Sequence, residues 1–303
     1  MKYFSTRGNS EALNFIDVLT SGTAKDGGLY VPENFPKFSK EEIADFETAS
    51  YQDLASHLLY PYVEGFLSKD DFEQVVKNAY ESFTIPEVVK LVETKNIGYV
   101  LELFHGPTGS FKDLALQLLP RLIGAVMKSD QRSLYVVATS GDTGGAVANG
   151  FLGVEGVKVV ILYPKGKVSE IQEKQLTTLG QNISALEVDG VFDDCQEMVK
   201  NAFLDASLSS VQLTSANSIN IGRWLPQMFY YFIAYRALKY KNKKLVFSIP
   251  SGNFGNICAG IMSQQMGLPI NHFVASTNVN DTVPRYLKTA NYEPLPTKQT
   301  VSN

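Results

Sequence analysis

Most of this 303-residue chain alternates between short, continuous apolar runs and segments of helical periodicity. Such runs are typical of strands that are buried on both faces of a parallel sheet, because helices then cover the sheet from either side. The pattern predicts the α/β fold class, with parallel sheets flanked by helices. The predicted strands span 98–104, 134–138, 157–163, 213–215, 245–249 and 271–276. The predicted helices span 113–128 with a kink at Pro120, about 145 onward, 169–179, 193–204, 219–240 with a break near Pro226, and 257–266.

The first 85 residues follow a different pattern, with a turn-rich opening and two helical segments at 50–67 and 69–82. Ser68 is suited to cap the second helix, because a serine hydroxyl can accept a hydrogen bond from the free backbone N–H groups of the first turn. Pro86 is typical of a boundary. We therefore predict a mainly helical N-terminal domain followed by a larger region, with limits at 1–85 and 86–303.

The composition limits the class of partner. The chain has 27 basic and 31 acidic residues and a net charge of −4, which does not favour binding to a phosphate backbone. The first ten residues lack the apolar stretch of a secretory signal, and no apolar run is long enough to cross a bilayer. Cys195 and Cys258 are isolated, which offers no metal-ligand spacing and indicates a reducing compartment. We expect a cytoplasmic protein that binds no metal, nucleic acid or membrane.

Ligands of open α/β sheets bind at the carboxyl ends of strands, so the loops that follow the predicted strands are the candidate site. The loop His105–Asp113 (HGPTGSFKD) places Lys112 among glycine, proline and aromatic residues at a strand-to-helix turn. Partial desolvation there would lower the pKa of the lysine and make it nucleophilic, as Schiff-base lysines require. A P-loop is excluded, because Phe111 and Asp113 occupy the places where that motif needs Gly and Ser or Thr. From this loop alone, a solvated lysine near a helix start stays the alternative.

Two further loops have the composition of anion-binding turns. The first, TSGDTGG at 139–145, follows a predicted strand and offers hydroxyls and backbone N–H groups at a helix N-terminus. A well-capped tight turn is the alternative for this loop. The second, SGNFGN at 251–256, has glycines that permit close backbone approach and asparagines that add amide donors. A nicotinamide-binding GxGxxG is absent. Two anion cradles and one candidate lysine suit a cofactor phosphate and a substrate carboxylate.

Five strings together resemble the threonine synthase family of fold-type-II pyridoxal-phosphate (PLP) enzymes: LFHGPTGSFKD, ATSGDTGGAV, NSINIGR, IPSGNFGN and TNVNDTVPR. SGTAKDGGLYVPE, at 21–33, resembles the opening of the extra N-terminal domain of the longer-chain branch, and the match runs over essentially the whole chain. The resemblance implies a tryptophan-synthase-β-like fold, in which 1–85 is that N-terminal domain and 86–303 is a PLP-binding catalytic region of two interleaved α/β subdomains. It also implies that family members continue past this sequence, which places the partner of the pyridine nitrogen beyond residue 303.

The resemblance assigns roles within the three loops. Lys112 carries pyridoxal 5'-phosphate as a Schiff base and moves protons, Phe111 shapes the ring pocket, and Asp142 lies near the phenolic oxygen of the cofactor. The residues implied to hold the cofactor phosphate are Ser251, Gly252, Asn253, Phe254, Gly255 and Asn256. The residues implied to hold the substrate carboxylate are Thr139, Ser140, Gly141 and Thr143. Arg223 is a candidate for the substrate phosphate, with a structural salt bridge as the alternative.

The implied reaction converts O-phospho-L-homoserine and water to L-threonine and phosphate, which is carbon–oxygen lyase chemistry on a phosphate ester. Since fold does not choose among related reactions, a serine/threonine dehydratase or a threonine-synthase-like phospho-lyase stays open. The alternative outside the enzymes is a truncated, non-catalytic protein that only binds PLP. His105, in the lysine loop, is a further active-site candidate. The aromatic run 229–232 is expected in the core or at a subunit interface, so an oligomer stays open.

Overall fold

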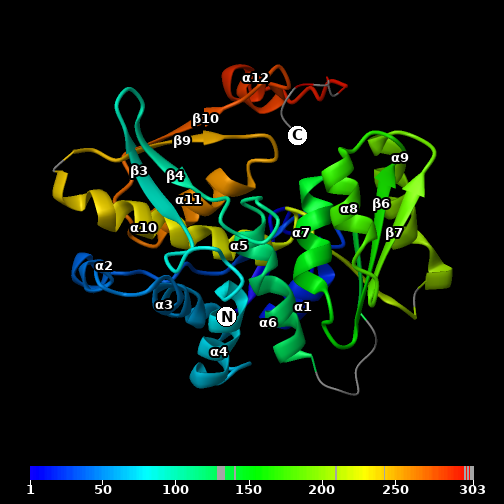
Figure 1. The fold of residues 1–303 in the computed structure, drawn as a ribbon, viewed down its shortest axis with the longest axis horizontal. Coiled ribbons are helices and arrows are strands. Elements are labelled where there is room, and N and C mark those ends of the chain that lie inside the picture. Colours follow the sequence, from blue (N-terminus) through cyan, green and yellow to red (C-terminus); the bar gives the residue numbers. More distant parts are fainter. Residues whose placement is uncertain are drawn as a thin grey trace.

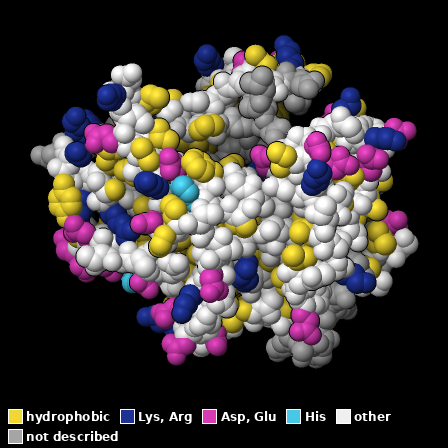
Figure 2. Space-filling view, in the orientation of Figure 1, with side chains coloured by type: hydrophobic (Ala, Val, Ile, Leu, Met, Phe, Trp, Pro, Cys, Tyr) yellow, Lys and Arg dark blue, Asp and Glu magenta, His cyan; other side chains and the backbone are white. Residues whose placement is uncertain are grey.

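The computed structural model describes residues 1–127, 134–139, 141–208, 210–241, 243–296, 298 and 300, with the backbone alone at 134–139 and 203–204. Helices surround two separate parallel sheets, one on each side of the molecule as drawn in Figure 1. The α/β class predicted from the alternation of apolar runs is confirmed. On the face shown in Figure 2, basic and acidic side chains are interspersed, as the nearly balanced charge of the chain requires.

The N-terminal part combines four helices with a small antiparallel sheet. The strands β1 and β2 pair through Tyr3–Ser5 and Tyr30–Pro32. The helices are α1 (Phe15–Ser21), α2 (Lys40–Asp45), α3 (Tyr51–Val63) and α4 (Lys69–Tyr80). The last two confirm the helices predicted at 50–67 and 69–82, although each ends earlier. The Ser68 side chain accepts a hydrogen bond from the backbone N–H of Asp71, so the predicted cap of α4 is present.

The larger parallel sheet has four strands in the order β7-β6-β5-β8. Its strands are β5 (Leu134–Thr139), β6 (Val157–Pro164), β7 (Ile183–Val188) and β8 (Gln212–Ser215). Its helices are α7 (Asp142–Phe151), α8 (Glu170–Thr177) and α9 (Phe192–Leu204). The three strands and three helices predicted here are confirmed, while β7 was not predicted.

The second sheet pairs β9 (Val246–Pro250) with β10 (His272–Ser276) in parallel, and α11 (Gly255–Gln265) connects them. The prediction that the apolar run at 98–104 joins a parallel sheet is wrong. This run forms β4 (Gly98–Glu102), which pairs antiparallel with β3 (Lys90–Thr94) in a hairpin. Gly98, the first residue of β4, has a φ of 95°, a backbone conformation that favours glycine. A final helix, α12 (Thr282–Thr289), follows β10.

Two predicted helices are interrupted. The segment at 113–128 forms α5 (Asp113–Leu116) and α6 (Leu118–Val126), and the break lies at Gln117 instead of at Pro120. The segment at 219–240 begins with the 3₁₀ turns η2 (Ile221–Arg223) and η3 (Leu225–Met228) and continues as α10 (Phe229–Leu238). The aromatic residues at the start of α10 are buried, which confirms the core placement. They belong to one hydrophobic core that also includes Phe15 and Leu54 from the N-terminal part.

Within the described ranges, no helix has the length and apolarity that a bilayer crossing requires.

Candidate active site

The lysine loop lies between β4 and α5, near the middle of the view in Figure 1. Its anchor is Asp113, which is fully buried and accepts hydrogen bonds from the Thr108 backbone N–H at 2.8 Å and the Thr108 Oγ1 hydroxyl at 2.7 Å. A Cβ at Gly106 would lie 2.5 Å from the Asp113 Cβ, so only glycine fits there. Burial raises the pKa of Asp113, and its hydrogen bonds oppose that rise. No role was predicted for Asp113 from the sequence, yet this carboxyl group fixes the loop that presents Lys112.

The structure brings Lys112 and Asp142 together from two of the three loops. The Lys112 Nζ atom lies 3.6 Å from Asp142 Oδ2, and the Lys112 side chain is only 18% exposed. Burial lowers the pKa of Lys112; Asp142 opposes this shift, and the nearby Arg223 guanidinium reinforces it. The exposed Phe111 ring lies beside the amine, with 5.8 Å from Nζ to the ring centroid. Partial desolvation of this kind is what a nucleophilic lysine requires.

Asp142 is the first residue of α7, and the carboxylate oxygen that does not face Lys112 also accepts a hydrogen bond. Gln172, on α8, donates from Nε2 to Asp142 Oδ1 at 2.7 Å. The chain enters α7 through Gly141, whose φ of 77° favours glycine, and no side-chain cap bond to this helix end is present among the described residues. Thr143 is half-buried in the first turn. Only the backbone of Thr139 is described, at the end of β5, and Ser140 lies outside the described residues.

The third loop leads from β9 into α11. Ser251 is buried and stabilises the turn itself, since its Oγ donates to Ile249 O at 2.9 Å. Phe254 has a left-handed φ of 59°, a conformation rare outside glycine and frequent at functional turns. The Asn256 Oδ1 atom accepts from the Tyr231 hydroxyl at 2.6 Å, so this side chain ties α11 to α10. A Cβ at Gly252 would meet no atom within 4 Å, which leaves the loop accessible.

The starts of α7 and α11 differ from those of five other helices. Side chains of Asn14, Ser39, Ser50, Ser68 and Ser169 cap α1, α2, α3, α4 and α8. By contrast, no side chain in the described part of the chain caps α7 or α11, and the same holds for α5, α6, α10 and α12. The start of a helix that lacks a side-chain cap suits an anion, because the positive end of a helix favours negative charge. Both loops predicted to bind anions lead into such a helix start, and anion binding at them stays a prediction.

Arg223, in η2, is a buried cation whose hydrogen bonds are incomplete. Its side chain is 3% exposed and donates from Nη1 to Ala216 O at 2.6 Å. The Nε atom has no hydrogen-bond partner, and no carboxylate pairs with Arg223 among the described residues. Burial lowers the pKa of Arg223 to about 10. The salt bridge that was the structural alternative for Arg223 is therefore not seen among the residues described. A buried cation is costly without an anion, so this geometry suits a ligand.

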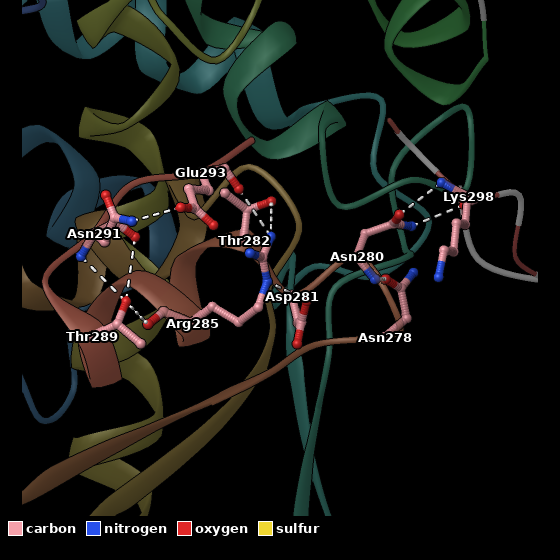
Figure 3. A network of polar contacts seen from close by, with 9 residues as sticks. All are labelled: Asn278, Asn280, Asp281, Thr282, Arg285, Thr289, Asn291, Glu293 and Lys298. Atoms are coloured by element: carbon pink, nitrogen blue, oxygen red, sulfur yellow. Dashed lines mark hydrogen bonds and ion pairs between the residues drawn. The ribbon is translucent and has the colours of Figure 1, made fainter. Parts of the chain in front are cut away.

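Two other features of the sequence have polar partners of their own. His105 pairs with Glu102 at 3.0 Å, across the end of β4. In the TNVNDTVPR string, Arg285 donates to Asp281 at 3.0 Å, and Asn280 bonds both backbone groups of Lys298 (Figure 3). These contacts fix the stretch that follows α12 onto the β10–α12 loop. Among the described residues, no group of His, Cys, Asp or Glu is suited to hold a metal ion.

Comparison with known protein families defines the class. Residues 83–303 match the family described as pyridoxal-phosphate dependent enzyme. Residues 2–80 match the family described as threonine synthase N terminus. The first match covers both parallel sheets and all three loops, so the chain has the fold of a PLP-dependent enzyme.

Individual relatives narrow the class further. The chain is 45% identical to a threonine synthase of Pseudomonas aeruginosa over 296 residues, which cover 97% of this chain and 63% of that protein. It is 42% identical to the Escherichia coli threonine synthase over 100% of this chain and 70% of the relative. A PLP-bound threonine synthase structure from Brucella melitensis superposes with a TM-score of 0.94 at 42% identity, over 100% of this chain and 66% of the other. The chain belongs to the threonine synthase family. It spans just under two thirds of the Pseudomonas and Brucella relatives.

Proposed function

We propose that this protein catalyses the PLP-dependent conversion of O-phospho-L-homoserine and water to L-threonine and phosphate, the last step of threonine biosynthesis. Family membership supports the reaction class. The observation that carries the proposal is the environment of Lys112, a partly desolvated amine that lies 3.6 Å from Asp142 and whose pKa the Arg223 guanidinium lowers further. An amine that loses its proton readily can act both as a nucleophile and as a base.

The residues present fit pyridoxal phosphate. Lys112 would hold it covalently, Phe111 would line the ring pocket, and Asp142 would lie near the phenolic oxygen. The uncapped start of α11 and the accessible Gly252 support Ser251–Asn256 as the site of the cofactor phosphate. When bound, PLP supplies an electron sink for the negative charge that develops on the substrate carbon.

The chain's own residues then bind the substrate and move its protons. We assign the substrate carboxylate to the loop at 139–143, supported by the uncapped start of α7. We assign the substrate phosphate to Arg223, whose Nε atom lacks a partner among the described residues. Lys112 Nζ takes the proton from the α-carbon, because its lowered pKa increases the neutral fraction of the amine. Asp142, 3.6 Å away, stabilises the ammonium group that results.

We also propose that 1–85 is a mainly helical N-terminal domain and that 86–303 is the catalytic region, built of two interleaved α/β subdomains. The family matches at 2–80 and 83–303 support this division. The continuous hydrophobic core suggests that the two parts fold together. A cytoplasmic location stays a prediction, supported by the two free cysteines, Cys195 and Cys258.

A product assay tests the proposed function. The protein is incubated with PLP and phosphohomoserine, and threonine, 2-oxobutyrate and phosphate are measured. Threonine and phosphate in equal amounts would support the proposal, whereas 2-oxobutyrate would identify a dehydratase or phospho-lyase instead. Borohydride reduction followed by peptide mapping checks the lysine. Labelling of any residue other than Lys112 would overturn the assignment, and Lys112→Ala should lose both the visible absorbance of bound PLP and turnover.

A further inference from the structure

Gln172 connects the start of α8 to the lysine site. Its Oε1 atom accepts a hydrogen bond from the Ser169 backbone N–H at 3.2 Å, while the Ser169 hydroxyl accepts from the Gln172 N–H at 3.3 Å. This reciprocal pair is a capping box, which occupies the oxygen of the Gln172 amide. The Nε2 group is left to point away from α8, and it donates to Asp142 Oδ1 at 2.7 Å.

The two oxygens of Asp142 therefore have different partners. Oδ1 accepts from Gln172, and Oδ2 lies 3.6 Å from Lys112 Nζ. The Asp142 carboxylate is about a third exposed, with 39% of its side chain accessible. The bond from Gln172 limits how far a side chain of this exposure can turn toward water. The charged groups that act on Lys112 are Asp142, from α7, and Arg223, from η2. Of these two groups of the described residues, Asp142 favours the charged amine, so its orientation affects how strongly the Lys112 ammonium is stabilised.

The placement of α8 supports a role at the site. One turn after Gln172, Gln175 packs against α7, where a Cβ at Gly145 would lie 2.8 Å from Gln175 Oε1. The same side chain approaches the lysine loop, with 3.5 Å between Gln175 Nε2 and Thr108 O. One face of α8 thus contacts both elements that carry the reactive pair.

We propose that Gln172 is a positioning residue for Lys112, acting through Asp142: its amide holds the carboxylate with Oδ2 directed at the amine. The inference rests on the proposed function in one respect, that Lys112 is the reactive amine of the site. It adds a residue from a third helix to the three loops that the sequence singled out.

The test measures the basicity of Lys112 in the unloaded protein, without turnover. The protein is labelled with trace amounts of trinitrobenzenesulfonate across a pH series, and the Lys112 peptide is quantified by mass spectrometry. Gln172→Met keeps the length of the side chain and removes the donor. The Lys112 pKa should fall in this variant, so its labelling rate at neutral pH should rise about two- to fivefold, in proportion to the neutral fraction of the amine. Ser169→Ala removes the cap but keeps the donor, and should leave the rate unchanged.

A double-variant cycle shows whether Gln172 acts through Asp142. In an Asp142→Asn background, Gln172→Met should have no further effect on Lys112 labelling. An unchanged rate in Gln172→Met, or an equal change in Ser169→Ala, would overturn the proposal in favour of helix capping alone. If Gln172→Met does not fold, Gln172→Asn takes its place, because the shorter amide cannot reach Asp142. The Lys112 labelling rate is then measured in the same way. Failure of the threonine assay would refute the proposed function and leave this labelling result standing.

Discussion

Arg223 offers the sharpest test of the site, because a structural role and a ligand-binding role predict opposite results for one substitution. Burial lowers the Arg223 pKa from its ordinary value to about 10, which corresponds to about 3 kcal/mol against the charged form. Arg223→Met removes that cost. It also removes the hydrogen bond to Ala216 O, and an unsatisfied buried carbonyl costs about 1–3 kcal/mol. These two effects nearly cancel, so the free energy of unfolding of the unloaded protein should change by less than about 2 kcal/mol.

Ligand binding should respond far more strongly than stability to the same substitution. Loss of a hydrogen bond to a charged group costs about 1.5–3 kcal/mol, which is about a 10- to 150-fold loss of affinity. We expect the KM for phosphohomoserine and the inhibition constant of inorganic phosphate to rise by such a factor in Arg223→Met. Arg223→Lys, which keeps the charge without the planar fork, should lie between the wild type and the methionine variant.

The measurements are urea denaturation of the unloaded protein and steady-state kinetics with PLP in excess. If Arg223 served an unseen structural ion pair, its removal would cost about 3–5 kcal/mol and would spare both ligand constants. That result would refute the assignment of the substrate phosphate to Arg223.

Three further perturbations test the fold and the cofactor site. Gly150→Ala should destabilise the protein by about 1–3 kcal/mol or more in urea denaturation, because the new Cβ would lie 1.9 Å from Leu116 O. Gly124→Ala is the control, because the Cβ added there makes only an ordinary contact at 3.5 Å. Gly255→Val should weaken PLP binding more than it lowers the Tm. A Cβ there has only ordinary contacts, the shortest 3.7 Å, but the added methyl groups would cover the start of α11. Equal effects on PLP binding and on the Tm would show that this loop is not part of the cofactor site. Lys112→Met should change how the free energy of unfolding depends on pH. The pKa of Lys112 is lowered in the folded state, so the unfolded state binds more protons in the interval below pH 10.5. The stability of the wild type relative to the variant should therefore rise with pH in that interval. A stability difference that does not change with pH would contradict the burial of the amine.

Elements with a strong local signal were predictable from the sequence. The helix α4 begins after a serine cap, and the strands β5 and β6 form from continuous apolar runs. The strand β7 escaped prediction because it is the edge of its sheet, where outward side chains are polar and the apolar run is broken. Pro120 did not mark the break between α5 and α6, because it lies in the first turn of α6, where the backbone N–H groups have no intrahelical partner.

The three loops of the candidate site could be predicted from the sequence, but the arrangement of their side chains could not. The glycines and hydroxyls identify the loops, but only the fold shows that Lys112 and Asp142 lie 3.6 Å apart. Asp113 was missed because an acidic residue at a helix start ordinarily faces solvent, whereas here it is fully buried. Gln172 was missed because the spacing of Ser169 and Gln172 indicates a capping box, and nothing in that local pattern shows which side chain the amide reaches.

The electrostatics of the described residues link the site to the stability of the whole chain. Lys112 and Arg223 are two neighbouring cations, Asp142 pairs with the first of them, and the starts of α7 and α11 add the positive ends of two helices. Each of these groups is a cost in the unloaded protein, and each becomes favourable when an anion binds beside it. Ligands that bind only the folded state stabilise it by mass action, by about 2.7 kcal/mol at a concentration one hundred times the dissociation constant. Since the cofactor and the substrate both carry phosphate, the same arrangement that suits the proposed reaction should make the stability of the fold depend on both ligands.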